Sequence, residues 1–309
     1  MSKVHYQATI NAPWEKDQPL FQQVGLVTGA SQGVGKGIAT ALFKAGCRVY
    51  ITGRNIVTLE KSAKDIMSTS SRSKGEVIPM ECDAADDEAT KNLFQKIFQD
   101  NNNHLNILVN NVTMNLSHTG KRNSHGAADD ASDINMNLWW NRDTLEEWDV
   151  TNRVGLRSYF ASSSTAAKAM IQQRRGLIVN ISSFGGVRKY IGIPHGVVKT
   201  ATDRMSSDMA DDLAEYGVAI VSMYPGLVRT EKMLATKAGP RILKSKASET
   251  PEYTGRAIVA LYLAVSKKSI QYNICIYIFK YICHTSYIHK HMYISLTSIF
   301  IFFCFKYTT

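Results

Sequence analysis

Short apolar runs rich in β-branched residues alternate with longer helix-forming stretches between Val24 and about Met223. Strands that are apolar along their whole length and separated by helices indicate a parallel sheet covered by helices on both faces. Strands are predicted at 24–28, 48–52, 76–82, 106–110, 176–182 and 218–223, and helices at 33–45, 56–67, 86–99, 145–173 and 197–216. The sequence therefore predicts one doubly wound α/β domain, which we assign to residues 24–264.

The segments before and inside this domain are polar. Residues 1–23 form an N-terminal extension without the apolar stretch of a secretory signal, and the five cysteines lack the spacing of a disulfide framework. Both features predict an intracellular, reducing location, in the cytoplasm or associated with the endoplasmic reticulum. Residues 114–136 are rich in Asn, Ser, His, Gly and Asp and are predicted to form a polar loop insertion at the surface.

Residues 250–264 carry the signals of a last helix. Thr250 suits the N-cap, Pro251 the first helical position, and Glu252 the positive end of the helix dipole. This helix is predicted to pack on the sheet through its apolar residues Ile258, Leu261 and Tyr262.

Residues 265–309 differ in composition from the rest of the chain. They contain five lysines and no acidic residue, Gly, Ala or Pro, and they are rich in Ile, Tyr and Phe, whose codons are AT-rich. We interpret this tail as translated intron sequence or a disordered segment that adds no strand, so that one sheet edge stays uncovered. A membrane anchor is the alternative, although the apolar run 294–305 is shorter than the ~20 residues of a spanning helix.

A glycine-rich turn links the first predicted strand to the first predicted helix. Residues 28–35 read Thr-Gly-Ala-Ser-Gln-Gly-Val-Gly. Glycines at such a turn let backbone N–H groups approach a pyrophosphate at the positive end of the helix. A plain tight turn is the alternative, but the place in the first βαβ unit favours a dinucleotide site of the Rossmann type. The candidate cofactor residues here are Thr28, Gly29, Ser31, Gln32, Gly33, Val34 and Gly35.

The end of the second predicted strand bears on the choice between the two nicotinamide dinucleotides. It reads Thr52-Gly53-Arg54, without the acidic residue that hydrogen-bonds the ribose 2′-hydroxyl of NAD(H). A guanidinium at Arg54 suits the 2′-phosphate of NADP(H), and the alternative is an ordinary exposed arginine. The sequence thus predicts NADP(H) in preference to NAD(H).

Further motifs occur at the ends of the other predicted strands. Asp83 follows the third strand, Asn110-Asn111 the fourth, Ser182-Ser183 the fifth and Pro225-Gly226 the sixth. Together with the Thr-Gly-x-x-x-Gly-x-Gly spacing, this set resembles the short-chain dehydrogenase/reductase (SDR) family over residues 20–264. The resemblance implies carbonyl reduction or alcohol oxidation with a nicotinamide cofactor, a small carbonyl or alcohol substrate, and assembly into homo-oligomers.

The resemblance also implies a catalytic set. Ser183 matches the family's substrate-orienting serine, Asn152 the asparagine that holds a relay water, and Lys199 the lysine that activates the proton donor and binds the nicotinamide ribose. The family's donor is the tyrosine of a Tyr-x-x-x-Lys motif, and here His195 occupies that position. Tyr190 lies nine residues before Lys199, off the helical turn that aligns the motif.

The histidine leaves three outcomes open. An imidazole with a pKa of ~6.5 suits acid–base catalysis, but it is shorter than a phenol, and the charge of Lys199 favours its neutral form. A lost general acid costs on the order of 10²–10⁴ in rate. The chain is therefore interpreted as a full oxidoreductase, a weakened one, or a catalytically silent protein that binds nucleotide or a partner.

The remaining motif residues are assigned to the cofactor by the same resemblance. Asp83 is expected at the adenine pocket or as the cap of the next helix, and Asn111 at the cofactor or the end of the fourth strand. Pro225, Gly226 and Thr230 are expected in a loop over the nicotinamide, where the alternative is a plain turn.

Several partner classes are not expected. Half of the net charge of +10 lies in residues 265–309, and no basic face interleaved with aromatic residues appears, so nucleic-acid binding is not predicted. No metal site is predicted, because nothing fixes the spacing of the Cys and His residues of the tail. Membrane association through this tail is not expected either.

Overall fold

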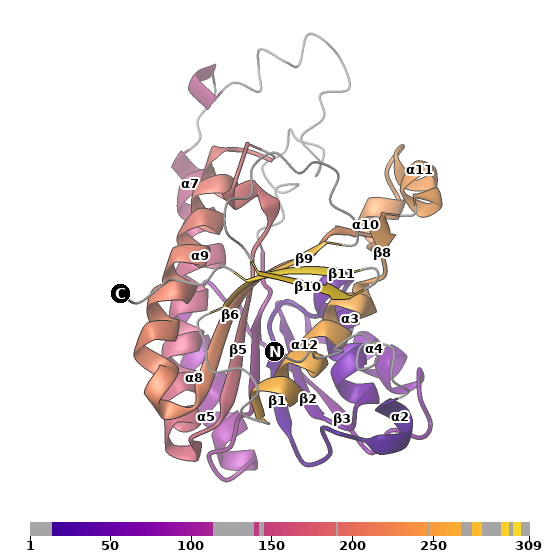
Figure 1. Ribbon diagram of the computed structural model, residues 1–309, viewed down its shortest axis with the longest axis vertical. Coiled ribbons are helices and arrows are strands. Elements are labelled where there is room, and N and C mark those ends of the chain that lie inside the picture. The colour runs from indigo at the N-terminus through magenta and orange to yellow at the C-terminus, as the bar shows by residue number, and fades with distance from the viewer. Residues whose placement is uncertain are drawn as a thin grey trace.

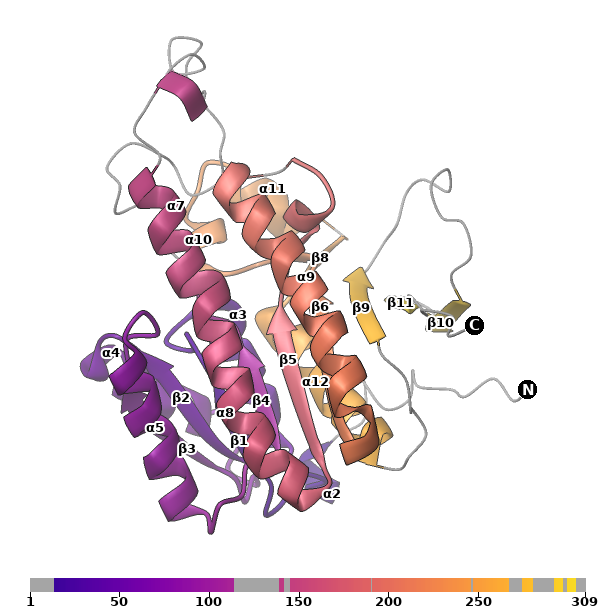
Figure 2. The same ribbon diagram turned by 90° about the vertical axis from the view of Figure 1, so that its left-hand side faces the viewer.

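The computed structural model describes residues 14–113, 139–141, 145–189, 191–245, 247–266, 274–279, 292–296 and 299–303. Within them, a central sheet is covered by helices on both faces (Figures 1 and 2). Seven strands run parallel in the order β9-β6-β5-β4-β1-β2-β3, and the antiparallel strands β11 and β10 extend the sheet beyond β9. The predicted doubly wound α/β fold is confirmed.

The elements follow the predicted order, and most bounds agree within one or two residues. The parallel strands are β1 (Val24–Val27), β2 (Arg48–Gly53), β3 (Glu76–Glu81), β4 (Ile107–Asn110), β5 (Gly176–Ile181), β6 (Val218–Tyr224) and β9 (Ile274–Phe279). The antiparallel strands are β10 (Met292–Leu296) and β11 (Ile299–Phe303), and a small second sheet joins β7 (Leu227–Val228) to β8 (Ser248–Glu249). The longer helices are α3 (Gly33–Lys44), α4 (Ile56–Met67), α5 (Asp87–Asp100), α7 (Leu145–Asn152), α8 (Ser158–Gln173), α9 (Ile193–Leu213) and α12 (Pro251–Ser266). The short ones are α2 (Trp14–Asp17), α10 (Glu231–Leu234) and α11 (Gly239–Lys244).

Successive strand residues point into two different apolar layers. Val27 and Val109 face the layer built with α3, α4 and α12, whereas Leu26 and Leu108 face the layer built with α5, α8 and α9. Side chains alternate along a strand, so a strand that is apolar at every position needs cover on both sides. This requirement explains why the apolar runs of the sequence predict the fold.

Helices α3 and α12 approach closely because of glycines. A Cβ on Gly37 would lie 2.2 Å from the backbone carbon of Pro251, and a Cβ on Gly255 would lie 2.7 Å from both Cβ of Ala41 and Cα of Ile38. The glycines therefore allow the two helix backbones to come together over the sheet.

The end of the chain corrects one prediction. Helix α12 begins at Pro251, and Ile258, Leu261 and Tyr262 are buried in the layer shared with α3, as predicted. The prediction that no strand follows is wrong, because β9 pairs in parallel with β6 and covers its edge. The Ile, Tyr and Phe residues that make the tail unusual are also residues that favour strands. The polar loop insertion at 114–136 and the rest of the tail lie outside the described residues.

In Gly255→Ala the new Cβ would meet Ile38 Cα, which cannot rotate away, at a cost of about 1–3 kcal/mol. The higher helix propensity of alanine returns about 1 kcal/mol, so we expect the free energy of unfolding to fall by up to about 2 kcal/mol. Urea unfolding followed by circular dichroism measures the change. Gly53→Ala is the control, since its Cβ would meet nothing closer than 3.5 Å. Equal stability of Gly255→Ala and the unmodified chain would contradict the close helix contact.

Candidate active site

The predicted site residues lie where the parallel strands end. The strand order reverses between β1 and β4, and ligands of doubly wound sheets bind at the carboxyl ends of the strands beside such a reversal. The turn after β1, Asn111 after β4, Ser183 after β5 and Pro225 after β6 all lie at this edge of the sheet.

The turn after β1 has a shape that only glycine allows. Gly29 and Gly33 have φ values of +64° and +61°, which side chains other than glycine rarely adopt. A Cβ on Gly29 would lie 2.8 Å from Cα of Val112, and a Cβ on Gly35 only 2.5 Å from the carbonyl oxygen of Gly29. Ser31, Gln32 and Val34 complete this turn. A backbone cradle at the start of a 12-residue helix fits a dinucleotide pyrophosphate.

Asn111 and Thr28 stabilise this cradle through hydrogen bonds. The Asn111 side-chain amide donates to the carbonyl oxygens of Thr28 and Gly29, both at 3.0 Å. The Asn111 backbone N–H donates to the Thr28 hydroxyl, also at 3.0 Å. Both residues thus join the turn to the end of β4 through contacts within the protein.

Two other candidate cofactor residues lie at the ends of β2 and β3. Arg54 is exposed and makes no ion pair with any residue in the described part of the chain. The Asp83 carboxylate accepts a hydrogen bond from the Ala85 N–H at 2.9 Å. The alternative that Asp83 caps the next helix is wrong, because Asp86 accepts from the N–H groups of Glu88 and Ala89 at the start of α5.

A carboxylate from the loop after β6 reaches the phosphate-binding turn. Gln32 gives α3 no side-chain cap, and Oε2 of Glu231 instead accepts a hydrogen bond from the Gly33 N–H at 3.0 Å. Thr230 caps α10 through the Met233 N–H at 3.2 Å. Glu231 therefore takes the place at the start of α3 that an anionic ligand would take. The two residues are 198 positions apart, and no sequence pattern predicts this contact.

The Pro225-Gly226 turn is held by another acid. The Gly226 N–H donates to Oε1 of Glu249 at 3.1 Å, and Glu249 is only 2% exposed. Glu249 lies on β8, which pairs with β7 directly after the turn. Sequence analysis did not identify this residue, because the pairing strands have two residues each.

Ser183 and His195 lie in direct contact. Oγ of Ser183 is 3.0 Å from Nε2 of His195 and accepts a hydrogen bond from the Gly185 N–H at 3.2 Å. A Cβ on Gly185 would lie 2.9 Å from the imidazole, so this glycine gives the ring its place beside the serine. Each of the two side chains can donate to or accept from the other, depending on the imidazole tautomer.

Lys199 lies one helical turn beyond His195 on α9 and is buried. It is 5% exposed, and its ammonium donates to the Ile181 carbonyl oxygen at the end of β5 at 2.7 Å. Burial lowers the pKa of Lys199 to about 8, against an opposing effect of Asp203. Burial, and then the charge of Lys199, lowers the pKa of His195 to about 4. The imidazole is therefore neutral at pH 7.

Asn152 lies where the long predicted helix is interrupted. A π-helical turn over Arg153–Arg157 separates α7 from α8, which corrects the single helix predicted at 145–173. The Asn152 side-chain amide donates to the Trp148 carbonyl oxygen at 2.8 Å, one turn earlier. Gly155 in the π-helical turn lies against Val198, the neighbour of Lys199. π-helical turns are frequent at functional sites because they displace side chains from the regular helix.

Tyr159 is a tyrosine beside Lys199 that sequence analysis did not identify. Its ring centre lies 5.3 Å from the Lys199 ammonium nitrogen, and its hydroxyl donates to the Val112 carbonyl oxygen at 3.0 Å. The side chain is fully buried, and burial raises its pKa far above the usual range. Tyr159 is therefore a packing residue and not a replacement for the missing tyrosine. Tyr190 lies outside the described residues.

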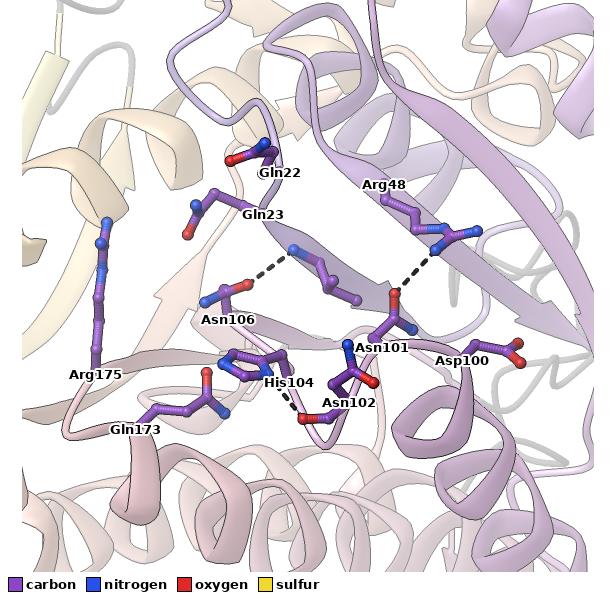
Figure 3. Close-up of a pocket in the computed structure, with 11 residues that line it drawn as sticks. Gln22, Gln23, Arg48, Asp100, Asn101, Asn102, His104, Asn106, Gln173 and Arg175 are labelled. Atoms are coloured by element: carbon purple, nitrogen blue, oxygen red, sulfur yellow. Dashed lines mark hydrogen bonds between the residues drawn. The ribbon is translucent and has the colours of Figure 1, made fainter.

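A pocket of about 550 Å³ lies at the opposite side of the sheet, where the parallel strands begin (Figure 3). Its residues lie at or before the amino ends of the strands and hydrogen-bond one another: the Asn106 side chain accepts from the Val24 N–H at 2.9 Å, and Asn101 from Arg48 at 3.2 Å. The pocket thus lies away from the carboxyl ends of the strands that carry Ser183.

Comparisons with known proteins agree with this geometry. A family model described as short chain dehydrogenase matches residues 23–239. The chain belongs to the short-chain dehydrogenase/reductase family. Members are oxidoreductases that bind nicotinamide cofactors, and the glycine cradle after β1 fits such a group. No helix in the described ranges is long and apolar enough to cross a membrane.

Individual SDR proteins resemble most of the chain. It is 36% identical to mouse (Mus musculus) and 34% identical to human (Homo sapiens) dehydrogenase/reductase SDR family member 1, in each case over 79% of this chain and 75% of the relative. A metagenomic short-chain oxidoreductase crystallised in complex with NADP is 23% identical, with a TM-score of 0.59 over 78% of this chain and 91% of that one. A putative gluconate dehydrogenase from Agrobacterium tumefaciens is 21% identical, with a TM-score of 0.65 over 82% and 93%. These structures share the fold.

We expect Glu231→Gln to bind nicotinamide dinucleotides about two- to fivefold more tightly, because a carboxylate at the start of α3 competes with the pyrophosphate. Titration of NADPH fluorescence measures the dissociation constant. The control is Glu215→Gln, which also removes one negative charge but lies just before the amino end of β6. Its dissociation constant for NADPH is expected to stay unchanged. Weaker binding by Glu231→Gln would show that the Glu231 contact supports the cofactor.

Proposed function

We propose that this SDR protein is an NADP(H)-dependent oxidoreductase that reduces carbonyls to alcohols, or catalyses the reverse, with an activity weakened by His195. The observation that carries the proposal is the contact between Ser183 and His195 beside the buried Lys199. A location in the cytoplasm or associated with the endoplasmic reticulum, and assembly into homo-oligomers, form part of the same proposal.

The cofactor assignment is supported by the ends of β1 and β2. The glycine cradle would hold the pyrophosphate, and the exposed guanidinium of Arg54, which has no ion-pair partner among the described residues, would meet the 2′-phosphate of NADP(H). Lys199 would bind the nicotinamide ribose. Bound there, the nicotinamide supplies or accepts the hydride.

The side chains at the end of β5 would act on the substrate oxygen. The Ser183 hydroxyl orients the carbonyl, and a proton must reach its oxygen as the carbon gains the hydride. The neutral imidazole of His195 can donate a hydrogen bond but is too weak an acid to give up its N–H proton. Only the imidazolium can transfer a proton, and with a pKa of about 4 it makes up about one molecule in 10³ at pH 7.

The same observation favours a second candidate function. A site whose proton donor is neutral at pH 7 can keep its cofactor cradle and still lack turnover, which describes a catalytically silent nucleotide-binding or partner-binding protein. NADPH binding without reduction of any carbonyl across the pH range would support this candidate.

We expect the unmodified chain to bind NADPH more tightly than NADH, and Arg54→Ala to reduce that preference by about 10- to 100-fold, because a hydrogen bond to a charged group is lost. Fluorescence titrations with both cofactors measure the preference. Arg72→Ala, another exposed arginine, is the control and should keep it. An equal preference in the unmodified chain and Arg54→Ala would refute the role of Arg54.

We expect carbonyl reduction to rise as the pH falls, by about 100-fold from pH 7 to pH 5, because the imidazolium fraction rises by that factor above a pKa of about 4. His195→Tyr should raise the rate at pH 7 by about 10²–10⁴. NADPH oxidation with a panel of aldehydes and ketones measures both effects.

The controls for this experiment use the same variant. Ser183→Ala introduced together with His195→Tyr should remove the gained activity, since the tyrosine would then act on an unoriented substrate. A measurable rate in the unmodified chain that does not depend on pH, together with no gain in His195→Tyr, would contradict the proposal that His195 weakens the activity.

A further inference from the structure

Helix α9 carries a third ionisable residue in line with the site. His195, Lys199 and Asp203 follow one another at intervals of four residues, so they lie on one face of the helix. The proposed reaction uses His195 and Lys199. Asp203 is partly buried, and no step of the reaction requires it to touch substrate or cofactor.

The Asp203 carboxylate lies among three hydroxyl groups. Ser222 and Tyr224 of β6 donate to its two oxygens, and the hydroxyl of Ser182, directly after β5, lies beside the carboxylate. A Cβ on Gly186 would lie 3.0 Å from Oδ2 of Asp203, so the carboxylate also lies directly against the turn that follows Ser183. One side chain therefore touches β5, β6 and the Ser183 turn.

These partners are the neighbours of the functional residues. Ser182 precedes Ser183, and Tyr224 precedes the Pro225-Gly226 turn. The Ser182 hydroxyl donates to the Lys199 carbonyl oxygen at 3.3 Å. Movement of the carboxylate would thus release the serine, the lysine and the turn together.

We propose that Asp203 is the positioning residue of this site: its carboxylate fixes the Ser183 turn and the Pro225-Gly226 turn against α9 and places an opposite charge one helical turn from Lys199. The effect of Asp203 on the charge of Lys199 follows from the fold alone. The effect of Asp203 on cofactor binding rests on the proposed function.

The groups that face Lys199 support this role. Helix α9 contributes His195 and Asp203, α8 contributes the phenol of Tyr159, and β5 contributes the Ile181 carbonyl oxygen. Tyr224 of β6 reaches Asp203 from the other side. Among these described groups Asp203 is the acid that raises the pKa of Lys199 against the effect of burial. An opposite charge within about 4–6 Å shifts a pKa by about 1–3 pH units.

The test is the pH at which Lys199 loses its proton, measured in the full chain. Cyanate carbamylates only the neutral amine, so the pH dependence of Lys199 carbamylation, followed by peptide mass spectrometry, gives this midpoint without cofactor or turnover. We expect Asp203→Asn to lower the midpoint by at least about 1 pH unit. Asp208→Asn, one turn further along α9 and paired with Arg204, is the matched control and should leave it unchanged.

A second variant covers the case in which Asp203→Asn does not fold. Tyr224→Phe removes one hydrogen bond from the carboxylate and should lower the midpoint in the same direction by a smaller amount. An unchanged Lys199 midpoint in every folded variant would overturn the proposal.

The pH dependence of NADPH affinity separates this proposal from the proposed function. If Asp203→Asn lowers the carbamylation midpoint of Lys199 and also loses its affinity for NADPH at a pH that is lower by the same amount, both the role of Asp203 and the proposed function are supported. A lowered midpoint in a chain that does not bind NADPH supports the role of Asp203 and contradicts the proposed function.

Discussion

The buried ammonium of Lys199 is the constraint around which the site is arranged. Removing an ion from water costs several kcal/mol unless the protein supplies compensating partners. At the end of β5 these partners are the Ile181 carbonyl oxygen at 2.7 Å, the Tyr159 ring at 5.3 Å and the carboxylate of Asp203. The same charge, added to burial, keeps the neighbouring His195 neutral. A tyrosine gains acidity from a nearby cation, whereas a histidine becomes harder to protonate.

Acidic side chains hold the loop after β6 at three successive points. Tyr224 donates to Asp203, Gly226 donates to Glu249 at 3.1 Å, and Glu231 accepts from Gly33 at 3.0 Å. The first two contacts fix the loop to α9 and β8, and the third ties it to the phosphate-binding turn. A pyrophosphate that binds at the start of α3 would have to displace the third contact.

Sequence patterns predicted the local elements well and the long-range contacts poorly. The helix at 56–67 has its predicted bounds, since Asn55 caps it and its apolar residues recur with the helical period. The family motifs likewise gave the residues beside Lys199. The spacing of Asp203 after Lys199 was visible, but its partners on β6 follow only from the fold. Strand β9 was missed because its composition was interpreted as a sign of disorder, although Ile, Tyr and Phe also favour strands.

The central claim, that the residue in the donor position is neutral at physiological pH, is tested most directly by NMR titration of the imidazole. Chemical shifts of the His195 ring nitrogens, assigned by comparison with His195→Gln, give its pKa in the full chain. We predict a pKa of about 4, well below the ordinary ~6.5. A His195 pKa at or above 6.5 would contradict the claim, since the imidazolium would then be available as a proton donor near neutral pH.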